Sequence, residues 1–193
     1  MQILLVGISC VGKTTIGKYL AERINYKFFD LDNEVEKFFN KSIECLKSEF
    51  LTDYSFTKEA ALVLKNIVMN NSNQNCVIAL PPSGLKGSYY KIIRKAQCFT
   101  IVLRDTPENI LSRLTFYDID SNLIKVRLTE LIRSRYLKSI KEDTRYFNKF
   151  YKKTDIEVDI SGLTIEDSAQ KIEALIKNAG MHKGEPLKTD FLV

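Results

Sequence analysis

The sequence predicts an α/β fold in which a single parallel sheet carries helices on both faces. Three observations predict it. Five short apolar runs are spread along the 193 residues, segments with helical periodicity separate them, and a glycine-containing motif joins the first run to the first helical segment. Strands that alternate with helices are typical of parallel sheets with right-handed crossovers. A chain of this length favours one domain with a sizeable core.

The five apolar runs are the predicted strands. They are rich in Ile, Val, Leu and Phe, and most are too short and too continuously apolar to have one solvated face. Such runs are typical of buried parallel strands. The predicted strands cover residues 3–6, 27–31, 76–80, 99–103 and 156–160.

Apolar residues at helical spacing predict the helices between these strands. The positions predicted to share a helix face are Ile16, Leu20 and Ile24; Val35 and Phe39; Ala61, Leu64, Ile67 and Val68; Val126, Leu128, Leu131, Ile132, Leu137 and Ile140; and Ile165, Ala169, Ile172 and Ile176. We therefore predict one domain over residues 1–178. Periodicity is lost in a C-terminal tail, residues 179–193, which we expect to be mobile or to pack outside the core. The only histidine, His182, lies in that tail, which disfavours a histidine base.

Composition narrows the class of protein. The net charge of +5 comes without a dense basic block, so it suits a phosphorylated small molecule at least as well as nucleic acid. The four cysteines form no close pair, which disfavours zinc and redox motifs. We see neither a secretory signal pattern nor an apolar run of about 18 residues. We therefore expect a cytoplasmic protein with reduced thiols and no membrane partner.

The strongest motif lies between residues 7 and 15. Gly7, Gly12, Lys13 and Thr14 fit the pattern G-x-x-x-x-G-K-[ST], which follows a predicted strand and precedes a predicted helix. In this pattern the loop N–H groups cradle phosphates, the lysine reaches the β- and γ-phosphates, and the hydroxyl ligates Mg²⁺. The sequence thus predicts bound ATP and Mg²⁺. The predicted nucleotide contacts are Gly7, Ser9, Cys10, Val11, Gly12, Lys13, Thr14 and Thr15.

Two aspartates lie at the end of the second predicted strand. Asp30 and Asp32 are two residues apart, so we expect both side chains on one side of the strand end, where a parallel sheet opens its ligand crevice. One carboxylate could hold Mg²⁺ through water, and the other could accept the proton of an acceptor hydroxyl. The alternative is an acidic strand end that caps the next helix, since Asp favours both places.

At this point the chain resembles a known family. The stretch "GISCVGKTTIGKYLAERINYKFFDLDNEVEKFFNKSI" is similar to the opening of shikimate kinases, and the resemblance continues weakly to about residue 176. It implies a three-layer P-loop kinase fold with strand order 2-3-1-4-5 and a mobile lid at about 114–125. It also implies roles for individual residues. Asp30 would join Thr14 at the metal, Asp32 would bind the acceptor and act as base, Arg113 would lie near the transferred phosphate, and Arg145 would bind the acceptor.

The departures from the family fall on the acceptor side. The stretch "FLTDYSFTKEAALVL" has no arginine where the family holds the acceptor's carboxylate. "LPPSG" replaces three glycines after the third strand, and proline removes N–H donors there. The expected lid, "FYDIDSNLIK", lacks an Arg-Pro pair, and "DISGLTIEDS" lacks the basic residue often laid on adenine. The nucleotide-binding motifs of the family are thus retained, and its acceptor-binding motifs are replaced by other residues.

These observations predict an ATP-dependent kinase that phosphorylates a hydroxyl of a small metabolite, with shikimate one candidate acceptor. We expect a monomer or weak dimer. One alternative is a nucleoside monophosphate kinase. Another is a catalytically silent nucleotide-binding protein, against which the retained Asp32 argues. A third is a nucleic-acid-linked NTPase with a basic aromatic patch at "RYFNKFYKK", residues 145–153, although the aromatic residues of such a helix more often pack inward.

Overall fold

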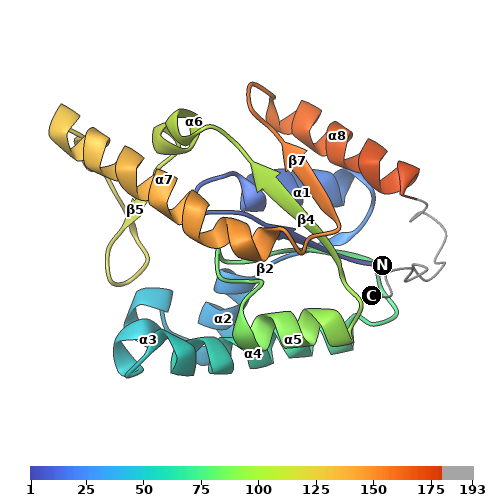
Figure 1. Ribbon diagram of the computed structural model, residues 1–193. Coiled ribbons are helices and arrows are strands. Elements are labelled where there is room, and N and C mark those ends of the chain that lie inside the picture. Colours follow the sequence, from blue (N-terminus) through green and yellow to red (C-terminus); the bar gives the residue numbers. More distant parts are fainter. Residues whose placement is uncertain (180–193) are drawn as a thin grey trace.

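The computed structural model describes residues 1–179, and its centre is a five-stranded parallel sheet (Figure 1). The strand order is β2-β3-β1-β4-β7, which confirms the predicted order 2-3-1-4-5. The strands are β1 (Gln2–Val6), β2 (Lys27–Asp30), β3 (Cys76–Ala79), β4 (Phe99–Arg104) and β7 (Ile156–Asp159). The central strand β1 pairs with β3 through Leu4↔Ile78 and with β4 through Leu4↔Thr100. All five strands run in the same direction, so their carboxyl ends meet at one edge.

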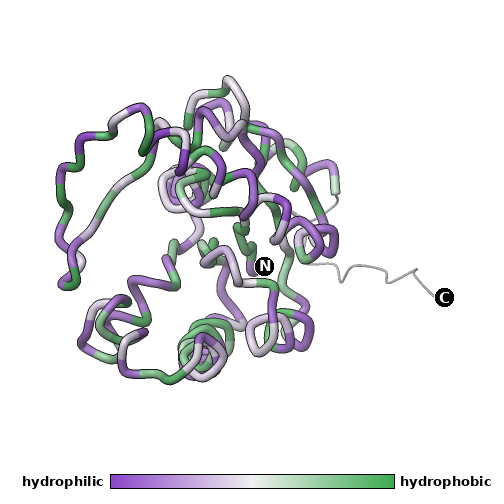
Figure 2. The backbone as a smooth tube through the Cα atoms, turned by 60° about the vertical axis from the view of Figure 1, so that its left-hand side comes forward, coloured by the Kyte–Doolittle hydropathy of each residue, from purple (hydrophilic) through white to green (hydrophobic). Residues whose placement is uncertain are grey.

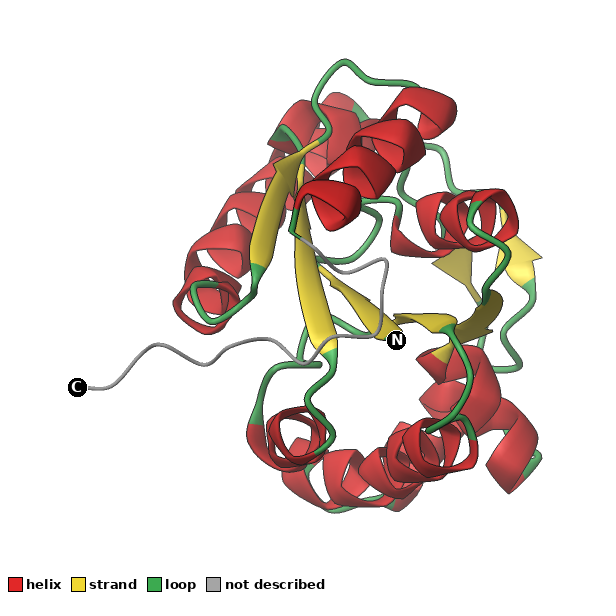
Figure 3. Cartoon of the chain, turned by 90° about the vertical axis from the view of Figure 1, so that its right-hand side faces the viewer, coloured by secondary structure: helices red, strands yellow, loops and turns green. Residues whose placement is uncertain are grey.

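Helices cover both faces of this sheet (Figure 3). α1 packs against α8 on one face, and α4 packs against α5 on the other. A small antiparallel hairpin, β5 (Phe116–Tyr117) with β6 (Leu123–Ile124), stands apart from the sheet. The helices are α1 (Lys13–Arg23), α2 (Leu31–Phe39), α3 (Ile43–Glu49), α4 (Asp53–Asn70), α5 (Gly87–Lys95), α6 (Pro107–Ser112), α7 (Glu130–Tyr151) and α8 (Ile165–Asn178).

Three features of this architecture differ from the expectation. The second strand ends at Asp30, so Asp32 lies in the first turn of α2 and not on a strand. The long helix α7 begins at Glu130, after Val126 and Leu128, and Leu131 is 62% exposed. The short helices α3, α5 and α6 were not predicted. Each has at most nine residues, too few for apolar periodicity to stand out.

Three further predictions concern the cysteines, membrane-spanning segments and the C-terminal tail. All four cysteines carry free thiols. Within residues 1–179, no helix combines the length and the apolar character that crossing a bilayer requires. His182 and the rest of the proposed tail from residue 180 lie outside the described residues.

Close packing of α1 on the sheet depends on Gly17. A Cβ at this position would lie 2.7 Å from Phe28 Cε2 and 3.0 Å from Leu5 Cδ1. Alanine favours a helix interior by about 1 kcal/mol over glycine, but overpacking costs about 1–3 kcal/mol. We expect Gly17→Ala to lower the free energy of unfolding by about 1–2 kcal/mol, measured by urea titration. The exposed neighbour Lys18→Ala is the control, and a Gly17→Ala protein as stable as this control would contradict the packing argument.

Candidate nucleotide and acceptor site

The loop between β1 and α1 is shaped for close approach of a ligand to the backbone. Gly7 has a φ of 144°, and a Cβ there would lie 2.9 Å from the carbonyl oxygen of Leu103. Gly12 has a φ of 109° and is the N-cap of α1, with no side chain capping the helix. The first N–H groups of α1 are therefore available to an anion, as in other phosphate-binding loops.

Lys13 folds back over this loop. Its Nζ donates hydrogen bonds to the carbonyl oxygens of Gly7 at 3.0 Å and Ile8 at 2.9 Å. Burial lowers the pKa of Lys13 to about 8, although the nearby charges of Asp32 and Asp30 act in the opposite direction. The loop thus holds a partly buried cation beside two carboxylates.

A hydroxyl and a carboxylate meet at the start of α1. Thr14 Oγ1 donates a hydrogen bond to Asp30 Oδ2 at 2.6 Å. Asp30 also caps α2, because its other oxygen accepts the N–H of Asp32 at 3.1 Å. The capping alternative is therefore correct for Asp30, and the same side chain still reaches the phosphate loop. The prediction that both aspartates extend from one side of a strand was wrong, because the helix starts between them.

Asp32 nevertheless lies at this site. Burial, followed by the negative charge of Asp30, raises the pKa of Asp32 to about 6, and the charge of Lys13 opposes this rise. A partly buried carboxyl with a raised pKa beside an ammonium group is typical of functional sites. Sequence reasoning missed a second group here, the buried phenol of Tyr89 on α5. Burial and then the charge of Asp32 raise the pKa of Tyr89.

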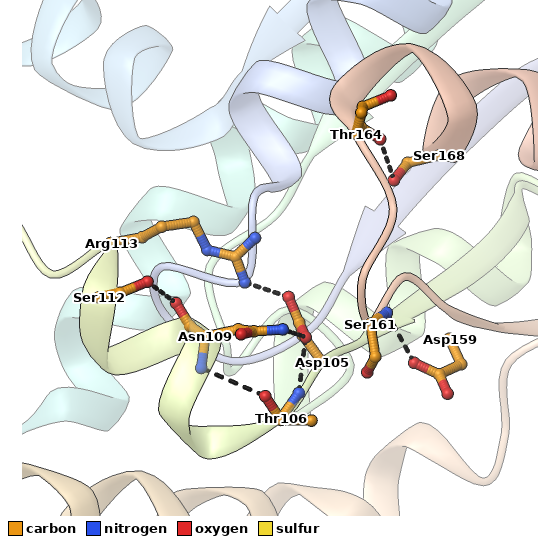
Figure 4. A network of polar contacts seen from close by, with 9 residues as sticks. All are labelled: Asp105, Thr106, Asn109, Ser112, Arg113, Asp159, Ser161, Thr164 and Ser168. Carbon is orange, nitrogen blue, oxygen red and sulfur yellow. Dashed lines mark hydrogen bonds and ion pairs between the residues drawn. The ribbon is translucent and has the colours of Figure 1, made fainter.

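Arg113 belongs to a polar network at the carboxyl end of β4 (Figure 4). It is the C-cap of α6, and its Nη2 donates to Asp105 Oδ2. Burial alone would raise the pKa of Asp105, but hydrogen bonds from Asn109, Arg113 and the Thr106 N–H outweigh it and lower that pKa. Leu103, two residues before Asp105, packs against Gly7, so the network lies at the phosphate-loop end of the sheet. The loop after β7 lies beside it.

Within residues 1–179, Arg145 makes no hydrogen bond or ion pair with another predicted site residue. It is exposed on α7 and lines a shallow groove of about 430 Å³ whose lining residues all come from that helix: Ser134, Leu137, Lys138, Lys141, Glu142 and Arg145. Its neighbour Tyr146 points elsewhere, since the Tyr146 hydroxyl accepts a hydrogen bond from Lys86 at 2.8 Å. In the aromatic stretch 145–153, Tyr151 is buried but Tyr146 is 46% exposed, so the expected inward packing is only partly correct.

The β5–β6 hairpin touches the helices that follow β2. Ser121 Oγ donates to Glu36 Oε1 at 2.7 Å, and Ser42 Oγ donates to the carbonyl oxygen of Ile119. The same Glu36 oxygen accepts the N–H of Ile43 at 2.9 Å. Figure 2 shows this segment as a long loop that descends to α2 and α3. Since Glu36 is one helical turn after Asp32, the hairpin tip and the candidate base are attached to the same helix.

We expect removal of one of these bonds to loosen the hairpin. Ser121→Ala deletes the donor to Glu36, and one hydrogen bond contributes about 0.5–1.5 kcal/mol, or roughly a 2- to 12-fold change in opening. Trypsin cleavage after Lys125 or Arg127 should therefore become several-fold faster. Ser48→Ala is the control, because that hydroxyl bonds only to Cys45 O within α3. Equal cleavage rates for the two variants would show that the contact does not hold the hairpin.

Comparisons with known proteins agree with this geometry. The model of the shikimate kinase family matches residues 9–177. A shikimate kinase from Caldanaerobacter subterraneus subsp. tengcongensis is 30% identical over 180 residues, which cover 93% of this chain and 98% of that one. The chain belongs to the shikimate kinase family. Membership supports a small-molecule kinase that resembles shikimate kinase.

Solved members of the shikimate kinase family share its fold. The crystal structure of shikimate kinase from Aquifex aeolicus superposes with a TM-score of 0.73 at 24% identity, over 94% of this chain and 99% of that one. A shikimate kinase from Acinetobacter baumannii, solved in complex with shikimate, gives a TM-score of 0.69 at 22% identity over 92% and 93%. The resemblance and the fold predicted from the sequence are thus confirmed.

Proposed function

We propose that this chain transfers the γ-phosphate of ATP to a hydroxyl group of a small metabolite, with Mg²⁺ bound at the phosphate loop. The observation that supports it most is the contact between Thr14 Oγ1 and Asp30 Oδ2. This contact brings a hydroxyl and a carboxylate to the phosphate loop, and Asp32 and Lys13 complete the same cluster. A protein that only bound nucleotide would need no base at that place.

The residues present fit both ATP and Mg²⁺. Mg²⁺ prefers oxygen ligands and in kinases is held by one or two protein groups together with substrate phosphates. Thr14 and Asp30 supply such oxygens, and no cluster of three or more metal-ligating His, Cys, Asp or Glu side chains occurs in residues 1–179. When bound, the ion would offset phosphate charge. The predicted loop contacts of residues 7–15 would hold the phosphates through backbone N–H groups.

Each charged residue has a proposed part in the reaction. Lys13 would leave the carbonyls of Gly7 and Ile8 and bind the β- and γ-phosphates. Asp32 would orient the acceptor hydroxyl and accept its proton as the new O–P bond forms and the bond between the γ-phosphate and ADP breaks. Arg113, already held by Asp105, would add positive charge near the phosphates. Residues 114–125, which include the β5–β6 hairpin, would act as the lid.

The identity of the acceptor is the open part of this proposal. Relatives of this chain are named shikimate kinases, so shikimate is the first acceptor to test. The stretch 50–64 lacks an arginine, and Arg145 lies in a groove formed by α7 alone. A chain that binds shikimate must therefore hold its carboxylate with other groups. We keep the cytoplasmic setting and the monomeric or weakly dimeric state as parts of the proposal.

The test is to detect a phosphorylated product by mass spectrometry. Purified protein is incubated with Mg-ATP and single acceptors: shikimate, gluconate, glucose, nucleoside monophosphates and free nucleosides. We expect a phosphate monoester of at least one hydroxylated metabolite, lost when EDTA removes Mg²⁺. Phosphorylation of nucleoside monophosphates alone would instead favour a nucleoside monophosphate kinase. Nucleotide binding without any product would favour the silent protein.

A further inference from the structure

A cluster of lysines and aromatic rings joins α5 to α7. We define it as Lys86, Tyr146, Lys149 and Phe150. The ammonium nitrogen of Lys86 lies 4.9 Å from the ring centre of Tyr146 and 5.3 Å from that of Phe150. The nitrogen of Lys149 lies 4.6 Å and 5.1 Å from the same two ring centres. Two positive charges therefore gather around one pair of rings, from two different helices.

This lysine–aromatic cluster has excess positive charge. In the described part of the chain, neither Lys86 nor Lys149 has a carboxylate within ion-pair distance, whereas Lys37, Lys41 and Lys47 each pair with a glutamate. Each cation gains about 0.5–2 kcal/mol from an aromatic face, but the rings do not neutralise the positive charge of the two lysines. The hydrogen bond from Lys86, followed by the two lysine charges, lowers the pKa of the Tyr146 phenol. The cluster thus favours any nearby negative charge.

The cluster lies on the acceptor side of the site. Lys86 ends the loop that leaves the carboxyl end of β3, and it is the N-cap of α5. Tyr151 Oη donates to the carbonyl oxygen of Pro82 at 3.0 Å, which fixes α7 against this loop. Tyr89, three residues after Lys86, is buried in α5, and the charge of Asp32 contributes to the raised pKa of its phenol. Figure 1 shows the start of α5 below the C-terminal half of α7.

We propose that Lys86 and Lys149, held over Tyr146 and Phe150, bind an anionic group of the acceptor, a carboxylate or a phosphate, at the end of its site away from Asp32. The assignment of this anion to the acceptor rests on the proposed kinase function. The anion site itself does not, because the positions of the two lysines define it. Ammonium groups bind as mobile point charges, so this site accepts either kind of anion.

The first experiment tests the anion site without any acceptor. Mg-ADP at saturation fills the phosphate loop, and inorganic sulfate is titrated by calorimetry. Lys86→Met and Lys149→Met should each weaken sulfate binding about tenfold or more, and Lys86→Arg should restore most of it. Lys152→Met is the matched control, an exposed lysine at the end of α7 with no ring contact among residues 1–179. Sulfate binding unchanged in Lys86→Met would overturn the site.

The second experiment tests whether the acceptor supplies the anion. Steady-state rates are measured for pairs of acceptors that differ only in the anionic group, such as shikimate and its methyl ester or gluconate and the acyclic glucitol. The anionic member should be preferred, and Lys86→Met should raise its KM about tenfold while the KM for ATP stays within twofold. An unchanged acceptor KM in a variant that has lost sulfate would overturn the acceptor assignment. If no acceptor is phosphorylated, the kinase proposal fails, and the sulfate titration still decides the site.

Discussion

Lys13→Ala should abolish phosphate transfer and weaken triphosphate binding. The ammonium group is the cation that the phosphate loop itself supplies, and hydrogen bonds to charged groups contribute about 1.5–3 kcal/mol each. We expect a loss of about 10- to 100-fold in affinity for Mg-ATP, measured by calorimetry. The rate should fall by at least about 10³-fold, because charge that develops in transfer loses its nearest positive partner.

The fold should survive this change. In the free protein Lys13 is partly buried, and burial lowers its pKa to about 8, so its ammonium group contributes little net stability. Lys13→Met keeps most of the side-chain volume and serves as a second variant, and Lys18→Ala, exposed on the same helix, is the control. Full transfer activity in both Lys13 variants would show that this loop does not bind the reacting phosphate.

Asp32→Asn should separate binding from turnover. The carboxylate faces the acceptor hydroxyl in our proposal, so affinity for ATP should stay within a few-fold while kcat falls about 10²- to 10⁴-fold. An exchange of one oxygen for nitrogen preserves shape, and the N-cap bond to Asp30 uses only the backbone N–H of residue 32. Full activity of Asp32→Asn would contradict the base assignment.

The same variant has a pH-dependent effect on stability. In the folded protein Asp32 keeps a proton up to about pH 6, while the unfolded chain releases it near roughly pH 4. Wild-type protein therefore loses stability as the pH rises between these values, and the loss is complete above pH 6. Asn does not titrate. In Mg²⁺-free buffer, the variant should gain about 1–3 kcal/mol relative to wild type between pH 4 and pH 7, measured by urea unfolding. A constant difference would mean that Asp32 has an ordinary pKa.

The phosphate loop could be predicted because three signals agree there. The strand before Gly7, the glycines at the turn and the helix from Lys13 all follow from local sequence, and the structure places each where it was expected. The sheet order came from the family resemblance. Alternation of strands and helices predicts a parallel sheet but does not specify which strands are neighbours.

The acceptor half could not be predicted in the same way. Asp30 and Asp32 lie at the boundary between β2 and α2. Asp is common both at strand ends and at helix N-caps, so the sequence did not show that the helix begins between these two residues. Lys86 and Tyr146 are 60 residues apart, and no periodicity links them. The family resemblance implied Arg145, the neighbour of Tyr146 on α7, as an acceptor-binding residue. On a helix, adjacent side chains are rotated by about 100° from each other. Arg145 therefore faces the groove on α7, while Tyr146 faces Lys86.

The most direct test of the central claim is ADP release from Mg-ATP, measured in one coupled assay with and without acceptor, for wild type and Lys13→Ala. The kinase proposal predicts that shikimate or another hydroxylated acceptor increases ADP release by wild type at least tenfold over the rate without acceptor, and that Lys13→Ala removes the increase. ATP binding confirmed by a thermal shift, with no stimulation by any acceptor tested, would contradict it and would favour a protein that binds nucleotide without transferring phosphate.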